Sequence, residues 1–309
     1  MLPDKEPTRP NPARFFTPDA TQPANAHTPA PLWAPPPRRR LPWTAVALGV
    51  VLGLMLGASL LIPVRTNVLL IGIDRAPAGT AAGRSDTLML WTFQPWEPYV
   101  GVLSIPRDLW VNSPGVGQNR INTAHYFAEV SQPGSGPAAA KQVVQSNFGV
   151  DVHYAIRFQF DGLVGAVDAL GGVELDLPQP MSGYAAGSHR LDGTQALAFV
   201  RDRAGSDDFA RMARGQLFLR AVMRQLLSPL TWPRLPLAFV RGVSSVQTDL
   251  PLWEWPRLAY ALLRVGPAGV DGRVLDRSMA IGFTTTDGAQ VLAPQWDRIN
   301  PLLLEMFGQ

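Results

Sequence analysis

Three apolar runs decide the fold of this chain: NVLLIGID (Asn67–Asp74), TLMLWTF (Thr87–Phe93) and YVGVLSI (Tyr99–Ile105). Each has the length and the content of branched and aromatic residues that are typical of a strand. The break between the second and third runs, QPWEP (Gln94–Pro98), is short and turn-like, which favours an antiparallel pair. We therefore expect the second and third runs to be neighbours in one sheet.

A charged rim follows from this arrangement if the first and second strands are antiparallel as well. The end of the first strand, the start of the second and the end of the third then lie at one edge of the sheet. Five charged residues that are distant in sequence meet there: Asp74, Arg84, Asp86, Arg107 and Asp108. The alternative is a set of ordinary surface salt bridges, each of which contributes little to stability. Clustering at strand ends favours a functional site, because the adjoining loops commonly carry function.

Helix and strand signals continue beyond these three runs. We predict helices over residues 137–148, 160–170 and 208–227, and a strand over residues 171–177. Residues 239–309 alternate short apolar runs with turns and are expected to form a closing structural layer. Together these elements predict an α/β fold, an αβα sandwich with a central mixed, largely antiparallel sheet.

The N-terminal part differs in composition. Residues 1–40 are rich in Pro, Ala, Thr and Asn without apolar periodicity, which predicts a disordered tail. Residues 41–64 carry no charge and are long enough for a transmembrane helix, since about 20 apolar residues cross a bilayer. A buried core helix and a cleaved signal peptide are the alternatives. The preceding Arg38–Arg40 predicts a cytoplasmic tail, so residues 65–309 would form the extracytoplasmic domain of a single-pass cell-membrane protein.

Composition argues against several kinds of site. The chain has no cysteine, which excludes disulfides, thiolate metal sites and cysteine nucleophiles. Its four histidines show no HxxH or HExxH spacing, which argues against a histidine-ligated zinc site. Residues 1–40 hold six basic and three acidic residues and so carry the whole net charge of +3. The remainder has 21 residues of each sign, and such a neutral balance predicts no nucleic-acid-binding face.

A second charged cluster lies in VRDRAGSDDFARMARGQ (Val200–Gln216), which holds four arginines and three aspartates. Arginine forks bind phosphate oxygens through paired hydrogen bonds. Carboxylates supply the hard oxygen ligands that Mg²⁺ prefers, and water and phosphate complete its coordination. Arginines and aspartates together are what a pyrophosphate-plus-metal site requires, because they stabilise the charge that develops during phosphoryl transfer.

Six motifs, in order along the chain, resemble those of the LytR-CpsA-Psr family of cell-wall proteins: GID (72–74), GRSDTLML (83–90), SIPRD (104–108), RIN (120–122), LDGTQALAFVRDR (191–203) and DDFARMARGQ (207–216). RSDT with SIPRD at this spacing is the most specific part of the resemblance. It implies a phosphotransferase outside the membrane that uses a divalent metal. Such a protein would move a glycopolymer from an undecaprenyl-pyrophosphate carrier to peptidoglycan, typically to the 6-hydroxyl of N-acetylmuramic acid.

The resemblance also implies roles by motif position. Asp74 and Asp86 would be the ligands of Mg²⁺ or Mn²⁺, and Asp208 would orient the arginines. Asp108 is our candidate for the base that takes the proton of the acceptor hydroxyl. The catalytic set is thus Asp74, Arg84, Asp86, Arg107, Asp108, Arg203 and Asp208. The residues implied to bind the lipid pyrophosphate are Arg84, Arg107, Arg201, Arg203 and Arg211, together with Arg120, which stands where many members have lysine.

Two residues depart from the family pattern, which is close to D-F-G-R-x-x-R-Q-Q. Ala210 replaces the glycine and Gly215 replaces the first glutamine. Gly215 removes an amide expected near the phosphate and weakens a helix by up to ~1 kcal/mol relative to alanine. Arg214 or Gln216 would compensate by contacting the pyrophosphate, so we expect activity with altered head-group contacts.

The implied lipid carrier also needs an apolar tunnel, because a polyprenyl chain is expelled from water. Candidate lining residues lie in the central segments: Phe158, Phe160, Leu163, Val164, Val167, Leu170, Leu197, Phe199, Phe218 and Val222. Each of them can equally be an ordinary core residue.

Several functions remain open at this point. The leading hypothesis is a membrane-anchored transferase whose partners are a polyprenyl-pyrophosphate-linked anionic glycopolymer and peptidoglycan. The alternatives are a protein that only binds polyprenyl phosphate or pyrophosphate and a lipid pyrophosphatase, in which water replaces the sugar hydroxyl. Transcriptional regulation is disfavoured, because the domain follows a predicted membrane helix and lacks a basic face.

Overall fold

The computed structural model describes residues 42–61, 64–74, 82–202 and 208–308. The chain divides into two compact units between Leu48 and Gly49, and the domain described below lies within the second unit. The predicted tail over residues 1–40 lies outside the described residues.

Helix α1 (Trp43–Leu61) lies inside the stretch predicted to be transmembrane. Among the residues that the structure describes, no helix combines the length and the apolar character needed to cross a membrane. The predicted span also includes Leu41, Ile62 and Pro63, which are not described. The transmembrane assignment of residues 41–64 therefore stays a prediction.

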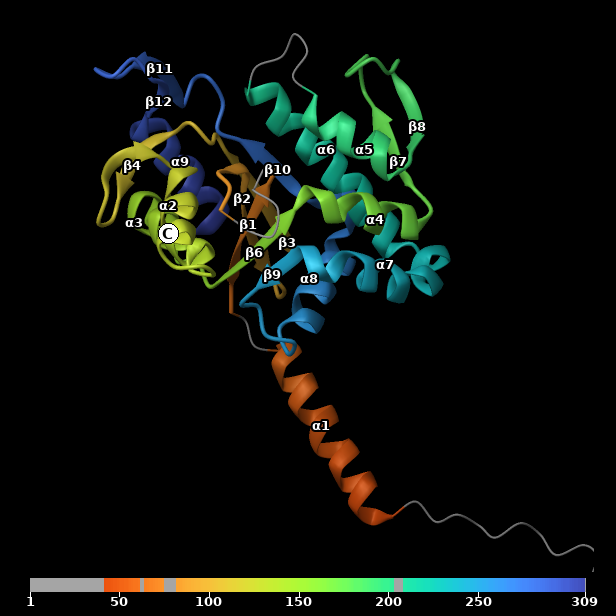
Figure 1. The fold of residues 1–309 in the computed structure, drawn as a ribbon. Coiled ribbons are helices and arrows are strands. Elements are labelled where there is room, and N and C mark those ends of the chain that lie inside the picture. The colour runs from red at the N-terminus through yellow and green to blue at the C-terminus, as the bar shows by residue number, and fades with distance from the viewer. Residues whose placement is uncertain (1–41, 62–63, 75–81, 203–207, 309) are drawn as a thin grey trace, which may run out of the picture. The chain divides into compact units, whose positions relative to one another are not determined.

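A six-stranded mixed sheet forms the centre of the domain (Figure 1). Its strand order is β10 (Asp271–Val274), β3 (Tyr99–Ile105), β2 (Ser85–Gln94), β1 (Thr66–Ile73), β6 (Tyr154–Gln159) and β9 (Val246–Thr248). β2 is antiparallel to both β1 and β3, as predicted. β1 is parallel to β6, β3 is parallel to β10, and β6 is antiparallel to β9. The central mixed sheet expected from the sequence is confirmed.

Helices cover both faces of this sheet, because its central strands are apolar on both sides (Figure 1). On one face lie α2 (Thr123–Ser131), α3 (Gly136–Phe148) and α9 (Trp296–Phe307). On the other face lie α6 (Asp208–Leu227) and α8 (Trp255–Gly269). Alternate residues of β1 follow this division, since Leu69 and Ile71 belong to the first core and Val68 to the second. The αβα arrangement thus follows from the pleat of the strands.

A third core lies where α6 meets two further helices and a hairpin. These elements are α4 (Phe160–Leu170), α5 (Gly193–Arg201), β7 (Val173–Leu177) and β8 (Gly187–Leu191). Two further hairpins pair β4 (Trp110–Ser113) with β5 (Gly117–Arg120) and β11 (Ala280–Thr284) with β12 (Gln290–Pro294). Three short helical segments follow α6 along the chain: η1 (Pro229–Arg234), α7 (Leu235–Gly242) and η2 (Val243–Ser245).

The predicted helices over residues 137–148, 160–170 and 208–227 are confirmed to within one residue as α3, α4 and α6. The C-terminal region corrects the expectation of a separate closing layer. Its strands β9 and β10 extend the two edges of the central sheet, and α8 and α9 cover its opposite faces. These short strands were missed because their pairing depends on the distant strands β6 and β3.

Candidate active site

The predicted charged rim forms at the edge of the sheet where β1 and β3 end and β2 begins. β1 and β2 pair regularly up to Gly72 and Thr87, and the register then shifts so that Ile73 pairs with Ser85. This shift leaves Asp86 as the extra residue of a β-bulge. Bulges re-aim side chains and are frequent beside active sites. The bulge therefore gives Asp86 an orientation that an unbroken strand would not.

Arg107 lies at the centre of the rim and contacts three carboxylates. Its Nη1 atom is 2.5 Å from Asp86 Oδ1, and its Nε atom is 3.4 Å from both Asp108 Oδ2 and Asp208 Oδ1. Burial alone would lower the pKa of the Arg107 guanidinium, but the carboxylates of Asp208, Asp108 and Asp86 hold it above its usual value. The cation is thus held firmly in its charged form.

Asp208, the first residue of α6, joins the network from the helical layer. It forms an ion pair with Arg211 one turn further along, and Arg211 also donates to the Asp86 carbonyl oxygen at 3.4 Å. Burial raises the pKa of Asp208 despite the opposing charges of Arg211 and Arg107. Its second carboxylate oxygen is buried and has no hydrogen-bond partner among the described residues. Asp208 therefore contacts two arginines through one carboxylate oxygen, while its other oxygen has no partner in the described part of the chain.

The RIN motif reaches the rim through backbone hydrogen bonds. The Ile121 N–H donates to the Leu109 carbonyl at 2.8 Å, and the Asn122 N–H donates to the Arg107 carbonyl at 3.3 Å. The β4–β5 hairpin extends this pairing. Arg120 consequently lies beside the end of SIPRD, with Nε 3.3 Å from Asp108 Oδ1 and Nη2 donating to the Gln290 carbonyl at 2.9 Å.

Arg201 reaches the rim from the last turn of α5 and forms an ion pair with Asp74, whose carbonyl it also contacts at 3.2 Å. The LDGTQ motif explains the position of this helix. Asp192 caps α5 in a capping box with Gln195. At Gly193 a Cβ atom would lie 2.3 Å from the Val164 carbonyl oxygen, so only glycine allows this approach of α5 to α4.

The structure joins six of the predicted site residues into one network: Asp86, Asp108, Asp208, Arg107, Arg120 and Arg211. Asp74 and Arg201 form a further ion pair where β1 ends. Arg84 lies next to them in sequence, is exposed, and has no ion-pair partner in the described part of the chain. Arg203 lies outside the described residues.

Arg214 and Gln216 both form hydrogen bonds within the protein. Arg214 is buried and donates to the Asp202 carbonyl. Gln216 donates to Ser104 Oγ at 2.9 Å and to the Arg273 carbonyl at 2.6 Å, which fastens α6 to β3 and β10. Residue 216 lies on a different side of α6 from Arg211, whereas Arg214 lies one turn beyond Arg211 on the same side. Contact of Arg214 or Gln216 with the pyrophosphate therefore stays a prediction.

A buried polar group that the sequence left unassigned supports the loop before Asp86. His125 on α2 is fully buried, and its Nδ1 atom lies 3.1 Å from the Gly83 carbonyl oxygen. Burial lowers the pKa of His125. Its neighbour Glu129 accepts from the backbone of Gly134 and Gly136 and pairs with Arg157 at 3.1 Å. A histidine three residues after the RIN motif was the only sequence signal, and its partners are distant in sequence.

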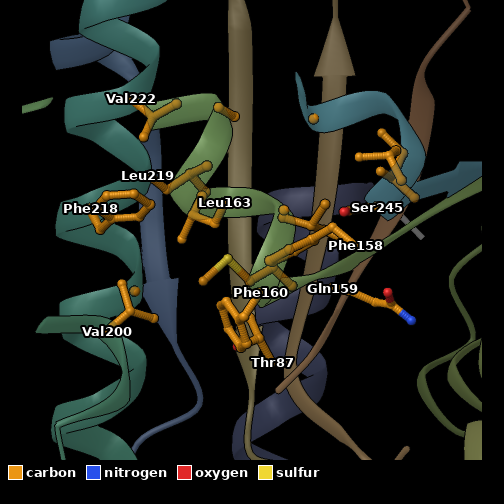
Figure 2. A pocket seen from close by; sticks show the side chains of 18 of the residues that line it. Thr87, Phe158, Gln159, Phe160, Leu163, Val200, Phe218, Leu219, Val222 and Ser245 are labelled. Atoms are coloured by element: carbon orange, nitrogen blue, oxygen red, sulfur yellow. The ribbon is translucent and has the colours of Figure 1, made fainter. Parts of the chain in front are cut away.

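An apolar cavity of about 390 Å³ lies between α4, α6 and the sheet (Figure 2). Figure 2 shows Phe218, Leu219 and Val222 of α6 on one side and Phe158 and Phe160 on the other. Five predicted tunnel residues line it, namely Phe158, Phe160, Leu163, Phe218 and Val222. The other five candidates, Val164, Val167, Leu170, Leu197 and Phe199, do not line it. Val167 and Phe199 are buried in the third core, and Leu170 is buried as well.

The apolar cavity adjoins the charged rim. A small cleft beside it is lined by Asp86, Arg107, Asp208 and Arg211 and shares four lining residues with the cavity: Thr87, Met89, Val200 and Gly215. Gly215 thus lies at the junction of the two spaces, and a Cβ atom there would lie 3.2 Å from Met89 Cε. The site can therefore hold a molecule with an anionic head and an apolar tail.

The predicted metal ligands agree in part with the needs of a divalent cation. Asp74 and Asp86 offer hard oxygen donors at neighbouring strand ends. Asp208 contacts the same arginine as Asp86, namely Arg107, and its Oδ2 atom has no hydrogen-bond partner among the described residues. In the described part of the chain, no group of three or more His, Asp or Glu side chains is placed to hold a metal by itself. These residues fit Mg²⁺ when phosphate oxygens and water complete its coordination.

Comparison with known proteins agrees with the motifs. A sequence model of the LytR_cpsA_psr family matches residues 64–302. The chain belongs to this family. As a LytR_cpsA_psr protein it is 36% identical over 168 residues to the polyisoprenyl-teichoic acid–peptidoglycan teichoic acid transferase TagU of Oceanobacillus iheyensis, across 52% of each chain. It is 31% identical over 224 residues to the probable cell wall biosynthesis protein LcpB of Corynebacterium glutamicum, across 64% of this chain and 52% of LcpB. The chain thus spans about half the length of these curated relatives.

Solved structures support the fold of this LytR_cpsA_psr domain. Bacillus subtilis TagV has a TM-score of 0.64 at 22% identity, with 80% of this chain and 98% of TagV covered. TagT bound to LIIa-WTA has a TM-score of 0.62 at 24% identity, with 79% of this chain and 91% of TagT covered. At these identities the likeness establishes the α/β fold with its central mixed sheet.

Proposed function

We propose that this protein is a membrane-anchored phosphotransferase that moves an anionic glycopolymer from a polyprenyl-pyrophosphate carrier to peptidoglycan. The proposal includes the N-acetylmuramic acid 6-hydroxyl as acceptor, residues 41–64 as the anchor and an extracytoplasmic domain. One observation carries it: an apolar cavity meets a cleft lined by arginines and aspartates at Thr87, Met89, Val200 and Gly215. A lipid pyrophosphate has this same division into an apolar chain and a dianionic head.

Relatives support the substrate class. TagU is named as a transferase of teichoic acid from a polyisoprenyl carrier to peptidoglycan, and TagT has been solved bound to LIIa-WTA. We extend the transfer reaction, but not the particular polymer, to this chain.

The ion pairs suit a site in which arginines exchange their carboxylate partners for the pyrophosphate of the ligand. Arg107, Arg201 and Arg211 are held by carboxylates in the free protein. An incoming pyrophosphate offers oxygens of higher charge in the bidentate geometry that guanidinium groups prefer. Arg84, which has no ion-pair partner among the described residues, is positioned to bind first. Binding therefore redistributes preformed charges, which lowers the cost of reorganisation in the transition state.

The transfer step that we propose conserves the number of phosphate bonds. The acceptor hydroxyl oxygen attacks the phosphorus that carries the glycopolymer, and the bond from this phosphorus to the bridging oxygen breaks. Polyprenyl phosphate leaves, and the hydroxyl proton passes to Asp108. A divalent cation held by Asp74 and Asp86 would supply Lewis-acid neutralisation of the phosphate charge. Arg107 and Arg211 stabilise the negative charge that develops on the phosphate oxygens.

The test incubates the full chain in detergent with a polyprenyl pyrophosphate, with and without Mg²⁺. The release of phosphate and of polyprenyl phosphate is measured. We compare Asp86→Asn and Arg211→Lys with Arg224→Lys, a control further along α6 whose ion pair with Asp176 is largely exposed. Turnover that needs Mg²⁺ and is lost in the first two variants supports the proposal. Tight binding without turnover would instead make the protein a lipid carrier.

An acceptor distinguishes transfer from hydrolysis. With a glycopolymer-linked substrate and peptidoglycan fragments, the proposal requires a covalent polymer–peptidoglycan product. Phosphate release that continues unchanged without any such product would identify a lipid pyrophosphatase.

A further inference from the structure

An exposed apolar face covers one end of the domain, formed by residues 229–264 of η1, α7, η2, β9 and the start of α8. Six of its large apolar side chains that are more than half exposed are Leu230, Trp232, Phe239, Val240, Leu252 and Trp253, and we call this set the tryptophan face. Leu230 and Leu252 are 90% and 83% exposed, which is unusual for leucine in a folded domain. Figure 1 draws α7 and α8 at the same end of the domain. Contiguous exposed apolar surface of this kind marks an interaction site.

The apolar cavity opens toward this face. Its lining includes Leu226 at the end of α6 and Val246 at the start of β9, and both are also exposed to solvent. Figure 2 shows Val222 at the end of the cavity opposite to Thr87 and Val200, with Ser245 beside Phe158. The cavity therefore leads from the charged rim at one end to the tryptophan face at the other.

The charge of the face is positive. Its two carboxylates are neutralised, Asp249 by Lys141 at 2.5 Å and Glu254 by Arg257 at 2.8 Å. Arg234, Arg241 and Arg264 have no carboxylate partner within the residues that the structure describes. Exposed tryptophan and leucine beside arginines that lack a carboxylate partner are typical of a surface that binds at the interface of an anionic bilayer.

The chain enters the domain at this same end. Arg257, near the start of α8, donates a hydrogen bond to Thr66 Oγ1, and Thr66 is the first residue of β1. Four residues separate the end of α1 at Leu61 from Thr66, so that link spans at most ~18 Å. A membrane anchor over residues 41–64 would hold the tryptophan face close to the bilayer surface.

We propose that the tryptophan face docks on an anionic lipid bilayer, so that the open end of the apolar cavity faces the membrane surface from which a polyprenyl chain enters. This inference rests on the proposed function for the identity of the lipid ligand. It adds a binding surface, its partner and the route of the lipid.

The test exploits the absence of cysteine from the chain. Single variants Leu230→Cys and Leu252→Cys carry an environment-sensitive fluorophore on the tryptophan face, and Ile281→Cys on β11 is an exposed apolar control outside it. The full chain is reconstituted in vesicles of phosphatidylcholine and phosphatidylglycerol that contain a quencher attached to the lipid chains. We expect loss of fluorescence at positions 230 and 252 but not at 281. Equal quenching at all three positions, or none at 230 and 252, would overturn the docking.

A second arm separates this proposal from the proposed function. In Leu230→Ser/Leu252→Ser, turnover of a long-chain polyprenyl pyrophosphate embedded in the vesicles should fall, while turnover of a short-chain, water-soluble one should not. An equal effect on both substrates would contradict the route through this face. Quenching needs no turnover, so an inactive protein that is still quenched at 230 and 252 would refute the catalytic function and leave the docking established.

Discussion

Gly215 offers a sharp test of how the two halves of the site are joined. Glycine in a helix interior costs ~1 kcal/mol relative to alanine. A Cβ atom at this position meets only Met89 Cε, at 3.2 Å, which is the end of a flexible side chain. Gly215→Ala should therefore raise the free energy of unfolding by ~0.5–1 kcal/mol, a rise in Tm of about 1–4 °C for a domain of this size.

A larger side chain at the same position should separate binding of the tail from binding of the head. Gly215→Leu fills the junction of the apolar cavity and the charged cleft. Each CH₂ group of a lipid that is displaced from the cavity forfeits about 0.8 kcal/mol, so displacing two weakens binding by more than about tenfold. Binding of inorganic pyrophosphate, which lacks the tail, should stay unchanged.

The assay combines thermal denaturation with equilibrium binding of polyprenyl pyrophosphate and of inorganic pyrophosphate to the full chain in detergent. Ala213→Leu is the matched control, because it adds the same side chain to α6 at a residue that lines neither space. If Gly215→Leu binds the lipid as tightly as the unchanged chain does, the cavity is not the site of the tail. A lowered Tm in Gly215→Ala would show that Met89 cannot move aside.

Two further predictions concern charge. Arg107→Met leaves the carboxylates of Asp86, Asp108 and Asp208 without their shared cation, which costs about 1–3 kcal/mol at pH 7 for this partly exposed cluster. Arg107 is one of two cations that oppose the rise in the pKa of Asp208 caused by burial, so its loss raises that pKa further. The loss of stability should therefore shrink as pH falls toward about 4 and the carboxylate takes up a proton. Urea denaturation at both pH values checks this, and an undiminished deficit at acid pH would contradict it. His125 is buried with a pKa below its ordinary value of 6.5, so unfolding takes up a proton below that pH. Stability should then decline as pH falls below 6.5, by up to ~1.4 kcal/mol per pH unit, and this part of the slope should be missing in His125→Gln. Identical slopes in both chains would show that His125 does not titrate between the folded and unfolded states.

Much of the site followed from the sequence, because it depends on local signals. A run such as NVLLIGID forms a strand wherever it is buried, and a five-residue break between strands favours an antiparallel neighbour. With the further assumption that the first two strands are antiparallel, which the structure confirms, Asp74, Asp86 and Arg107 lie at one edge of the sheet. The periodicity of residues 208–227 likewise predicted α6, which brings Asp208 and Arg211 to the same place.

Tertiary structure decided what depends on contacts between distant segments. The bulge at Asp86 arises from a register shift between β1 and β2, which no single strand encodes. Phe158 lines the cavity while Phe199 is buried in a core, although both are phenylalanines in apolar runs. The same limit hid the roles of Gln216, of His125 and of strands β9 and β10. A side chain's residue type determines what it can bind, but packing against elements far along the chain determines which partner it meets.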